Sequence, residues 1–408
     1  MTSSKPHGDG PRLPRTLSAL ARVIDGRRGF ISVMLAVTAA KLALAAVVGS
    51  TADVGQTLAG ARAFVAGRDV LDPGSTGGNP LYFLMGHSYI AAACLLVAQT
   101  LGLSFAFVIK TPAILADLLI VGLLATVSGG GAGAALLYLL NPVTILLSVY
   151  HGQVHTVAVA GAVLALWLAE RGRSMASAFV LALAATVRQH FAVLIVPLWM
   201  GSGARRALTF LGFAFTLLLL NVPLFASAHP GRVLMPMSNT GLWGYAMIVR
   251  HGPRVLALAG LSGVEATLAP LDRGLETYGP ALYWIWTIVF VVWVWWRRVE
   301  DLWRAALVYL LGFYAIGPGF GVQWLIWAVP FWLVVERRQA VLYCVLAGSY
   351  LMGSYWQWGL NAKYGVWSVT ANLHVLSRGD LLGLILVGAL GFFTWAFCAR
   401  AAWRLAWR

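Results

Sequence analysis

Ionisable and polar side chains interrupt the apolar segments of this chain at a few places, and these are the residues that could do chemistry. Asp53 follows the first apolar run, and Lys110 and Asp117 lie seven residues apart, two turns along one face of a helix. Charged groups at membrane depth are costly, so each is a candidate for function. The other candidates are His151, Gln153, His155, Arg188, His190 and Gln323.

The spacing of these residues favours some chemistries over others. His151 and His155 have the i, i+4 spacing of a metal pair, but Gly152 follows the first of them and no carboxylate is close in sequence. The sequence therefore predicts no metal and no cofactor, although it leaves a divalent metal open. Lys110 and Asp117 have an alternative role, because buried charges are often simply paired with other buried polar groups.

The composition indicates the elements that must position these residues. Of 408 residues, 60% are hydrophobic and 11% are charged, whereas soluble domains carry about 25% charged residues. So few charges cannot cover a water-soluble surface, and lipid is the solvent that suits the composition. The net charge of +15 lies mostly in short loops expected on the cytoplasmic side, which argues against nucleic-acid binding. The chain is predicted to be an all-α, polytopic membrane protein.

Charge asymmetry predicts the topology of the first part. Residues 1–28 are basic and rich in Pro, Gly and Ser, and we expect a disordered cytoplasmic tail. The first span, about 29–49, is too long for a signal-peptide core and is expected to be retained. An outer loop over 50–103 follows, in which 81–103 is predicted to lie against the outer leaflet as a re-entrant or juxtamembrane helix.

About ten full spans are predicted, or about 10–12 with partial crossings, and both termini are inside the cell. The remaining spans are expected at about 107–127, 133–150, 154–170, 207–226, 280–296, 301–317, 321–335, 338–357 and 380–399. Residues 175–201 fit either two half-helices that meet at Arg188 or one plain span. The predicted organisation is the tail, a membrane module over 29–226, an outer-face loop over 227–279 and C-terminal spans over 280–408. This topology brings nearly all of the candidate residues to the outer face.

Several short motifs occur in an order and spacing that resemble a known group, over residues 50–330. Asp53 follows the first span, Asn79-Pro80 precedes a surface apolar segment, and Asn141-Pro142 precedes Tyr150-His151-Gly152-Gln153. Gly241 to Gly244 and Gly317 to Leu325 form two later signatures. In this order, the motifs resemble the GT-C membrane glycosyltransferases, and in particular bacterial multi-span relatives of the dolichyl-phosphate-glucose glucosyltransferases. His155 and Arg188 depart from the group, where most relatives have Asp or Asn and Lys.

The resemblance implies an inverting glycosyltransferase that moves a sugar from a polyprenyl-phosphate donor to a glycan or lipid acceptor at the outer face of the plasma membrane. Asp53 would be the catalytic base, because the family has its catalytic aspartate after the first span. The donor phosphate would be held by Arg188, Lys110 and His190. The predicted sugar and acceptor pocket comprises Asn79, Asp117, His151, Gln153, His155, Trp243 and Gln323.

Two other classes of protein also fit part of the pattern. A secondary transporter or lipid flippase would explain intramembrane charges and a broken helix. It would not explain why the polar motifs gather on one face, because alternating access needs a site near the middle of the membrane. A non-catalytic partner subunit is the third class. The sequence does not identify the sugar, the acceptor or the oligomeric state.

Overall fold

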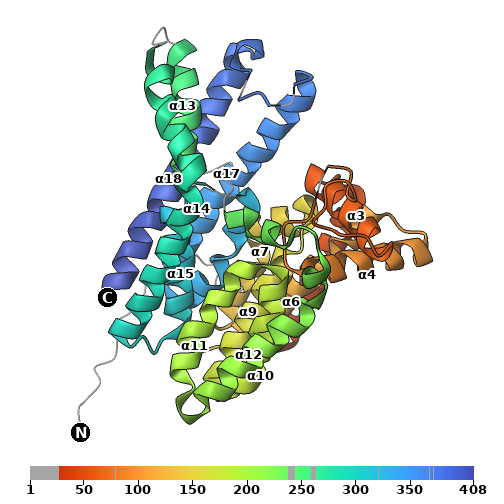
Figure 1. Ribbon diagram of the computed structural model, residues 1–408, viewed down its shortest axis with the longest axis vertical. Coiled ribbons are helices and arrows are strands. Elements are labelled where there is room, and N and C mark those ends of the chain that lie inside the picture. The colour runs from red at the N-terminus through yellow and green to blue at the C-terminus, as the bar shows by residue number, and fades with distance from the viewer. Residues whose placement is uncertain are drawn as a thin grey trace.

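The structure is a computed structural model that describes residues 27–78, 80–237, 244–258, 263–319, 321–366, 368–370 and 372–408. These residues form helices and connecting turns, with no β-strand among them, so the predicted all-α class is confirmed for this part of the chain (Figure 1). The predicted basic tail lies outside the described residues except for its last two positions.

Five helical segments are long and apolar enough to cross a membrane. They are α2 (Arg27–Val47), α5 with α6 (Phe105–Val108 and Thr111–Leu124), η3 with α12 (Gly203–Arg205 and Arg206–Leu220), α14 (Gly263–Arg297) and α18 (Arg378–Trp407). A sixth is the bent series α7, α8 and η1 (Ala132–Leu140, Pro142–Ile145 and Leu146–His151), which bends by 51° at the Asn141-Pro142 step. Proline removes a backbone donor and disfavours helix in the residue before it, which accounts for the bend.

The prediction of about ten full spans exceeds the number of described helices that reach full length. A span needs about 20 residues, whereas α9 (His155–Glu170), α10 (Ser174–Val187) and α15 (Leu302–Ile316) have 16, 14 and 15. These helices are apolar but short because polar, glycine and proline positions interrupt the segments. The other short helices are α4 (Met85–Leu101), η2 and α11 (Gln189–Leu194 and Ile195–Gly201), and η6 and α16 (Val322–Ile326 and Val329–Val335).

The segment over 175–201 has the broken form, which was one of the two predicted alternatives. Helix α10 ends at Arg188, whose φ of −143° and ψ of 103° are extended rather than helical. The chain then continues through η2 into α11. The break places Arg188 at the C-terminal end of α10, where its side chain can reach residues of other segments.

Helices pack in two groups that meet along the middle of the molecule (Figure 1). In the first group α9 packs against α10 and α6, and α10 packs against α12. In the second group α18 packs against α15 and α17 (Arg337–Lys363). Helix α16 joins them through contacts with α7 and α17, and the buried aromatic side chains of Trp327 and Trp332 lie in this shared core.

Most of the predicted outer-face loop over 227–279 is helical. It contains η5 (Pro230–Met237) and α13 (Ala246–Leu258), and α14 begins at Gly263 instead of near 280. Helix α13 packs along the end of α14 (Figure 1). Arg250 of α13 lies 3.2 Å from Asp272 and 2.7 Å from Glu276, both on α14. The polar residues that suggested a loop therefore pair between two helices.

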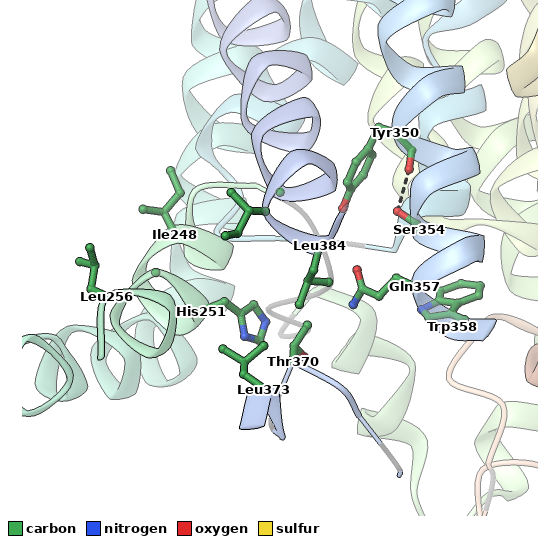
Figure 2. Close-up of a pocket in the computed structure, with 13 residues that line it drawn as sticks. Ile248, His251, Leu256, Tyr350, Ser354, Gln357, Trp358, Thr370, Leu373 and Leu384 are labelled. Carbon is green, nitrogen blue, oxygen red and sulfur yellow. Dashed lines mark hydrogen bonds between the residues drawn. The ribbon is translucent and has the colours of Figure 1, made fainter. Parts of the chain in front are cut away.

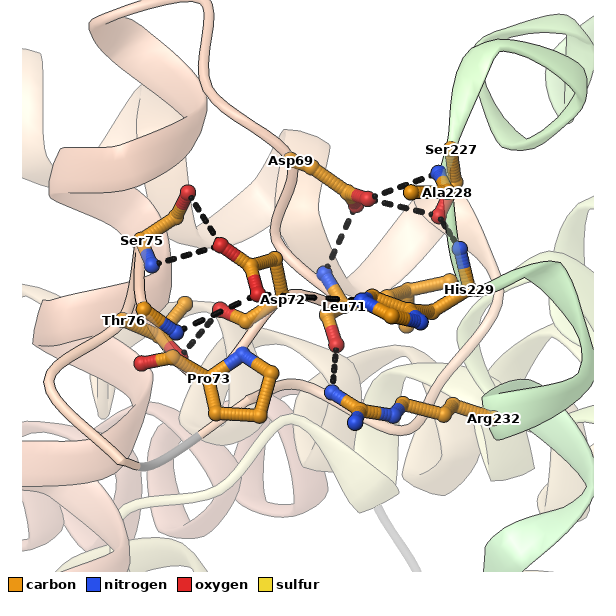
Figure 3. A network of polar contacts seen from close by, with 11 residues as sticks. Asp69, Leu71, Asp72, Pro73, Ser75, Thr76, Ser227, Ala228, His229 and Arg232 are labelled. Carbon is orange, nitrogen blue, oxygen red and sulfur yellow. Dashed lines mark hydrogen bonds and ion pairs between the residues drawn. The ribbon is translucent and has the colours of Figure 1, made fainter.

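Helices α3 (Ala52–Val65) and α4 pack together beside one end of the first group (Figure 1). The turns between them are tied to the segment that follows η4 (Val222–Ala226), as Figure 3 shows. Asp69 accepts from Ser227 Oγ at 2.8 Å, and Arg232 donates to the carbonyl of Leu71 at 2.7 Å. These contacts fix the part of the chain that follows Asp53 against a segment more than 150 residues later.

Candidate functional site

The predicted site residues come together at three places where helices begin or end. Asp53 lies in the first turn of α3, Gln153 lies between η1 and α9, and Arg188 lies at the end of α10. Gly152 makes this approach possible, because its φ is +78° and an added Cβ would lie 2.7 Å from a methyl group of Val54. The tight turn at Gly152 leaves the side chains on both sides of it, His151 and Gln153, within reach of Asp53.

The carboxylate of Asp53 is held through one of its two oxygens. Oδ2 accepts a hydrogen bond from Gln153 Nε2 at 2.7 Å and lies 3.0 Å from His151 Nε2. None of the described residues contacts Oδ1, and the side chain is 32% exposed. Burial raises the pKa of Asp53, but the hydrogen bond and charge of His151, together with the charge of Arg188, outweigh it and lower the pKa below its ordinary value. Asp53 is thus an ionised carboxylate with one free oxygen.

The guanidinium of Arg188 is fully buried and uses four of its five N–H groups within the protein. Nε donates to His155 Nδ1 at 3.1 Å, and NH2 donates to Gln153 Oε1 at 3.2 Å. NH1 donates to His87 Nδ1 at 2.9 Å and to the carbonyl of Val187 at 2.8 Å. One N–H of NH2 has no partner among the described residues, and it remains for a ligand.

His87 adds a second donor beside Arg188. Because arginine can only donate, His87 Nδ1 must be the acceptor, and the proton of the neutral ring is on Nε2. His87 Nε2 is buried and has no hydrogen-bond partner among the described residues. The ring of Phe83 covers the guanidinium, with its centroid 3.9 Å from Cζ. His87 Nε2 and NH2 of Arg188 thus each carry an N–H group that makes no hydrogen bond to a described residue.

Lys110, predicted to hold the donor phosphate, contacts backbone carbonyls at the end of α2. It is fully buried, and its ammonium group donates to the carbonyls of Ala45, Val48 and Gly49 at 3.3, 3.1 and 2.9 Å. All three donors of the ammonium group are thereby used at the C-terminal end of α2. The helix dipole favours a cation there, so Lys110 caps α2 instead of lying free for a phosphate.

Asp117 likewise lies in a separate buried cluster. Its carboxylate accepts from Lys41 Nζ at 2.8 Å, Tyr138 Oη at 2.9 Å and Ser148 Oγ at 2.6 Å. Lys41 and Asp117 are 2% and 1% exposed. The alternative in which Lys110 and Asp117 pair with other buried groups is therefore confirmed, and Asp117 does not face the network around Asp53.

The remaining predicted residues divide into those beside the network and those outside it. His190 is buried among the rings of Phe313, Trp324 and Trp327, and neither ring nitrogen has a hydrogen-bond partner among the described residues. Gln323 lies in η6, next to this aromatic cluster in sequence. Asn79 and Trp243, both predicted for the pocket, lie outside the described residues.

Four contributors were not predicted from the sequence. His87 and Phe83 touch Arg188, Trp327 Nε1 donates to His155 Nδ1 at 3.1 Å, and Tyr355 Oη lies 3.2 Å from His151 Nδ1. A histidine in an apolar segment was a usable signal for His87. The three aromatic residues, Phe83, Trp327 and Tyr355, carried none, because each lies in an apolar segment that contains other aromatic residues.

An apolar cavity of about 370 Å³ lies beside this network, between α13, α17 and α18 (Figure 2). Leu384 projects into it from α18, and Gln357 and Trp358 border it on α17. The Trp358 ring lies 6.2 Å from the ring of His151, which contacts Asp53. One wall of the cavity is therefore shared with the polar network.

Comparison of the chain with protein-family models, with curated proteins and with solved structures finds no match. In the part of the chain that the structure describes, no three His, Cys, Asp or Glu side chains are grouped so that they could hold a metal ion.

Proposed function

We propose that the protein is an inverting membrane glycosyltransferase that transfers a sugar from a polyprenyl-phosphate donor to a hydroxyl acceptor at the outer face of the membrane. The observation that carries the proposal is the pairing of a partly exposed carboxylate, Asp53, with a buried cation, Arg188, through a single amide. Direct displacement at an anomeric carbon needs one base for the incoming hydroxyl and a positive site for the leaving phosphate.

In this mechanism the acceptor oxygen forms a bond to the anomeric carbon as the bond from that carbon to the phosphate oxygen breaks. The acceptor proton moves to Asp53, and the electron pair of the broken bond leaves with the lipid phosphate. The phosphate is already a stable anion, so no strong acid is needed. The free N–H of Arg188 and the Nε2–H of His87 would stabilise its charge through charge-assisted hydrogen bonds.

The apolar cavity between α13, α17 and α18 supports a lipid-linked donor. It adjoins Trp358, so a chain in the cavity would place its polar end near His151 and Asp53. Burial of hydrocarbon contributes about 0.8 kcal/mol per methylene, which makes a long isoprenoid an effective anchor. The five or six helices able to cross a membrane provide the bilayer setting that such a donor requires.

The test is transfer by the purified protein from a panel of radiolabelled polyprenyl-phosphate sugars to lipid and glycan acceptors. Asp53→Asn is expected to bind donor with unchanged affinity and to lose turnover, because the amide cannot accept the proton. Asp72→Asn is the matched control, since Asp72 is an outer-loop carboxylate that bonds to Ser75 of its own turn and pairs with His229, away from Asp53 (Figure 3). Normal turnover by Asp53→Asn would reject Asp53 as the base. Absence of both transfer and prenyl-phosphate binding would reject the proposed function.

A further inference from the structure

Only one assignment of donors and acceptors fits the hydrogen bonds around His155. Arg188 Nε and Trp327 Nε1 both lie 3.1 Å from His155 Nδ1. Arginine and indole nitrogens can only donate, so Nδ1 carries no proton and its lone pair faces two donors. The proton of the neutral imidazole is therefore on Nε2.

The assignment at His155 also fixes the orientation of the Gln153 amide. His155 Nε2 lies 2.6 Å from Gln153 Oε1, which also accepts from Arg188 NH2 at 3.2 Å. Two donors on one side of the amide place its carbonyl oxygen there. The amide nitrogen is consequently on the other side, where it donates to Asp53 Oδ2 at 2.7 Å.

A second side chain, His151, lies beside the same oxygen of the Asp53 carboxylate. His151 Nε2 lies 3.0 Å from Asp53 Oδ2, and Tyr355 Oη lies 3.2 Å from His151 Nδ1. Each ring nitrogen of His151 thus faces an oxygen: Nε2 faces the carboxylate of Asp53, and Nδ1 faces the hydroxyl of Tyr355. Gln153 and His151 thus both approach Oδ2, whereas Oδ1 makes no hydrogen bond or ion pair with any of the described residues.

We infer that His155 is a positioning residue whose neutral, Nε2-protonated ring fixes the orientation of the Gln153 amide and so leaves Asp53 Oδ1 as the oxygen that takes the acceptor proton. The chain of contacts runs from Trp327 and Arg188 through His155 and Gln153 to Asp53. The catalytic consequence rests on the proposed function, but the protonation state of His155 does not.

The inference excludes two other roles for His155. A metal ligand needs a free lone pair on the imidazole, and the only one of His155 is occupied by two N–H groups. A proton shuttle needs a ring that gains and loses a proton, and a second N–H proton, on Nδ1, would face the guanidinium and the indole N–H. His155 therefore does not titrate while this network is intact.

The first measurement is nitrogen-15 NMR of histidine-labelled full-length protein in detergent micelles, with the His155 signals assigned by their loss in His155→Gln. The expected spectrum has an unprotonated Nδ1 and a protonated Nε2 that persist between about pH 5 and pH 8. A His155 signal that titrates in this range, or one protonated on Nδ1, would overturn the inference. This readout is independent of sugar transfer, so it separates failure of the inference from failure of the proposed function.

The second measurement separates positioning from simple packing. Trp327→Phe removes one donor to His155, and Trp332→Phe is its matched control, because Trp332 is equally buried and its Nε1 has no partner among the described residues. Trp327→Phe is expected to lower kcat about 3–10-fold with little change in KM, while Trp332→Phe leaves kcat unchanged.

Rescue at position 155 completes the test. Gln can accept from Arg188 and donate to Gln153 as the histidine does, so His155→Gln is expected to keep most of kcat and the wild-type pH profile. His155→Leu is expected to lose at least about tenfold in kcat, because Arg188 and Gln153 each lose a partner. Loss of a limb of the pH profile in His155→Gln would show that His155 titrates and would refute the positioning role.

Discussion

Lys110→Met discriminates between two roles for a buried lysine, as a ligand of the donor phosphate and as a cap of α2. Met matches the length of the lysine stem and removes the ammonium group. In the structure this change leaves three carbonyls at the end of α2, those of Ala45, Val48 and Gly49, without their donor. Since only Ser50 and Thr51 separate Gly49 from the start of α3 at Ala52, the change also loosens the turn that positions Asp53.

The size of the effect follows from the contacts. Hydrogen bonds to a charged donor are each worth about 1.5–3 kcal/mol, and a cation at a helix C-terminus contributes up to about 2 kcal/mol. The wild-type protein also bears the cost of removing the ammonium group from water, which Met does not. We therefore expect the free energy of unfolding to fall by a net value of about 2–4 kcal/mol.

Two measurements on Lys110→Met test this reasoning. Thermal unfolding in detergent should shift downward by a few degrees, and kcat should fall because Asp53 is less well held, while KM for the donor changes little. Arg188→Gln is the comparison at the phosphate site, and it should raise the donor KM strongly. A Lys110→Met protein with unchanged thermal unfolding and a much larger donor KM would refute the cap and restore the predicted phosphate role.

Three further predictions concern single contacts. His151→Gln removes a contact that lowers the pKa of Asp53, so that pKa should rise, and the acid limb of kcat/KM should move to higher pH because the base must be ionised. His87→Leu should raise the donor KM by about tenfold, measured by donor titration, because a phosphate loses one N–H donor; an unchanged KM would remove His87 from the site. Asp117→Leu should destabilise the protein by about 3–5 kcal/mol in thermal unfolding, since Lys41 is left buried and unpaired, and adding Lys41→Met should recover most of the loss.

The parts of the fold that the sequence predicts are those that depend on local patterns. Apolar composition predicts the helical class. The basic and polar residues around Arg188 fit a break or one plain span, and the structure has the break, between α10 and η2. The Gly152 turn is also local, because a glycine between two polar residues at the end of an apolar run marks a chain reversal. The residues on either side of it, His151 and Gln153, reach Asp53, so these three candidate residues lie together.

The hydrogen-bond partners of the buried charged residues could not be predicted in the same way, because they depend on how the helices pack. Lys110 and Asp117 share a helix face by periodicity, yet Lys110 reaches the end of α2 and Asp117 reaches the middle of it at Lys41. The sequence contains a signal for Lys41, a single charge in the middle of the first apolar run, which intramembrane cost should have marked as paired. Nothing in the sequence states that its partner is Asp117, 76 residues away.

The two ionic groups of the site are joined in a way that bears on catalysis. In a direct bidentate pair, both oxygens of Asp53 would bond to two N–H groups of Arg188, and neither oxygen would be free. With Gln153 between them, Oδ1 of Asp53 and one N–H of Arg188 have no partner among the described residues, and each charge still acts on the other. The proposed mechanism requires a base and an anion site that are both vacant before substrate arrives. The amide of Gln153 leaves one position free on each group, and the two charges remain close enough to stabilise each other.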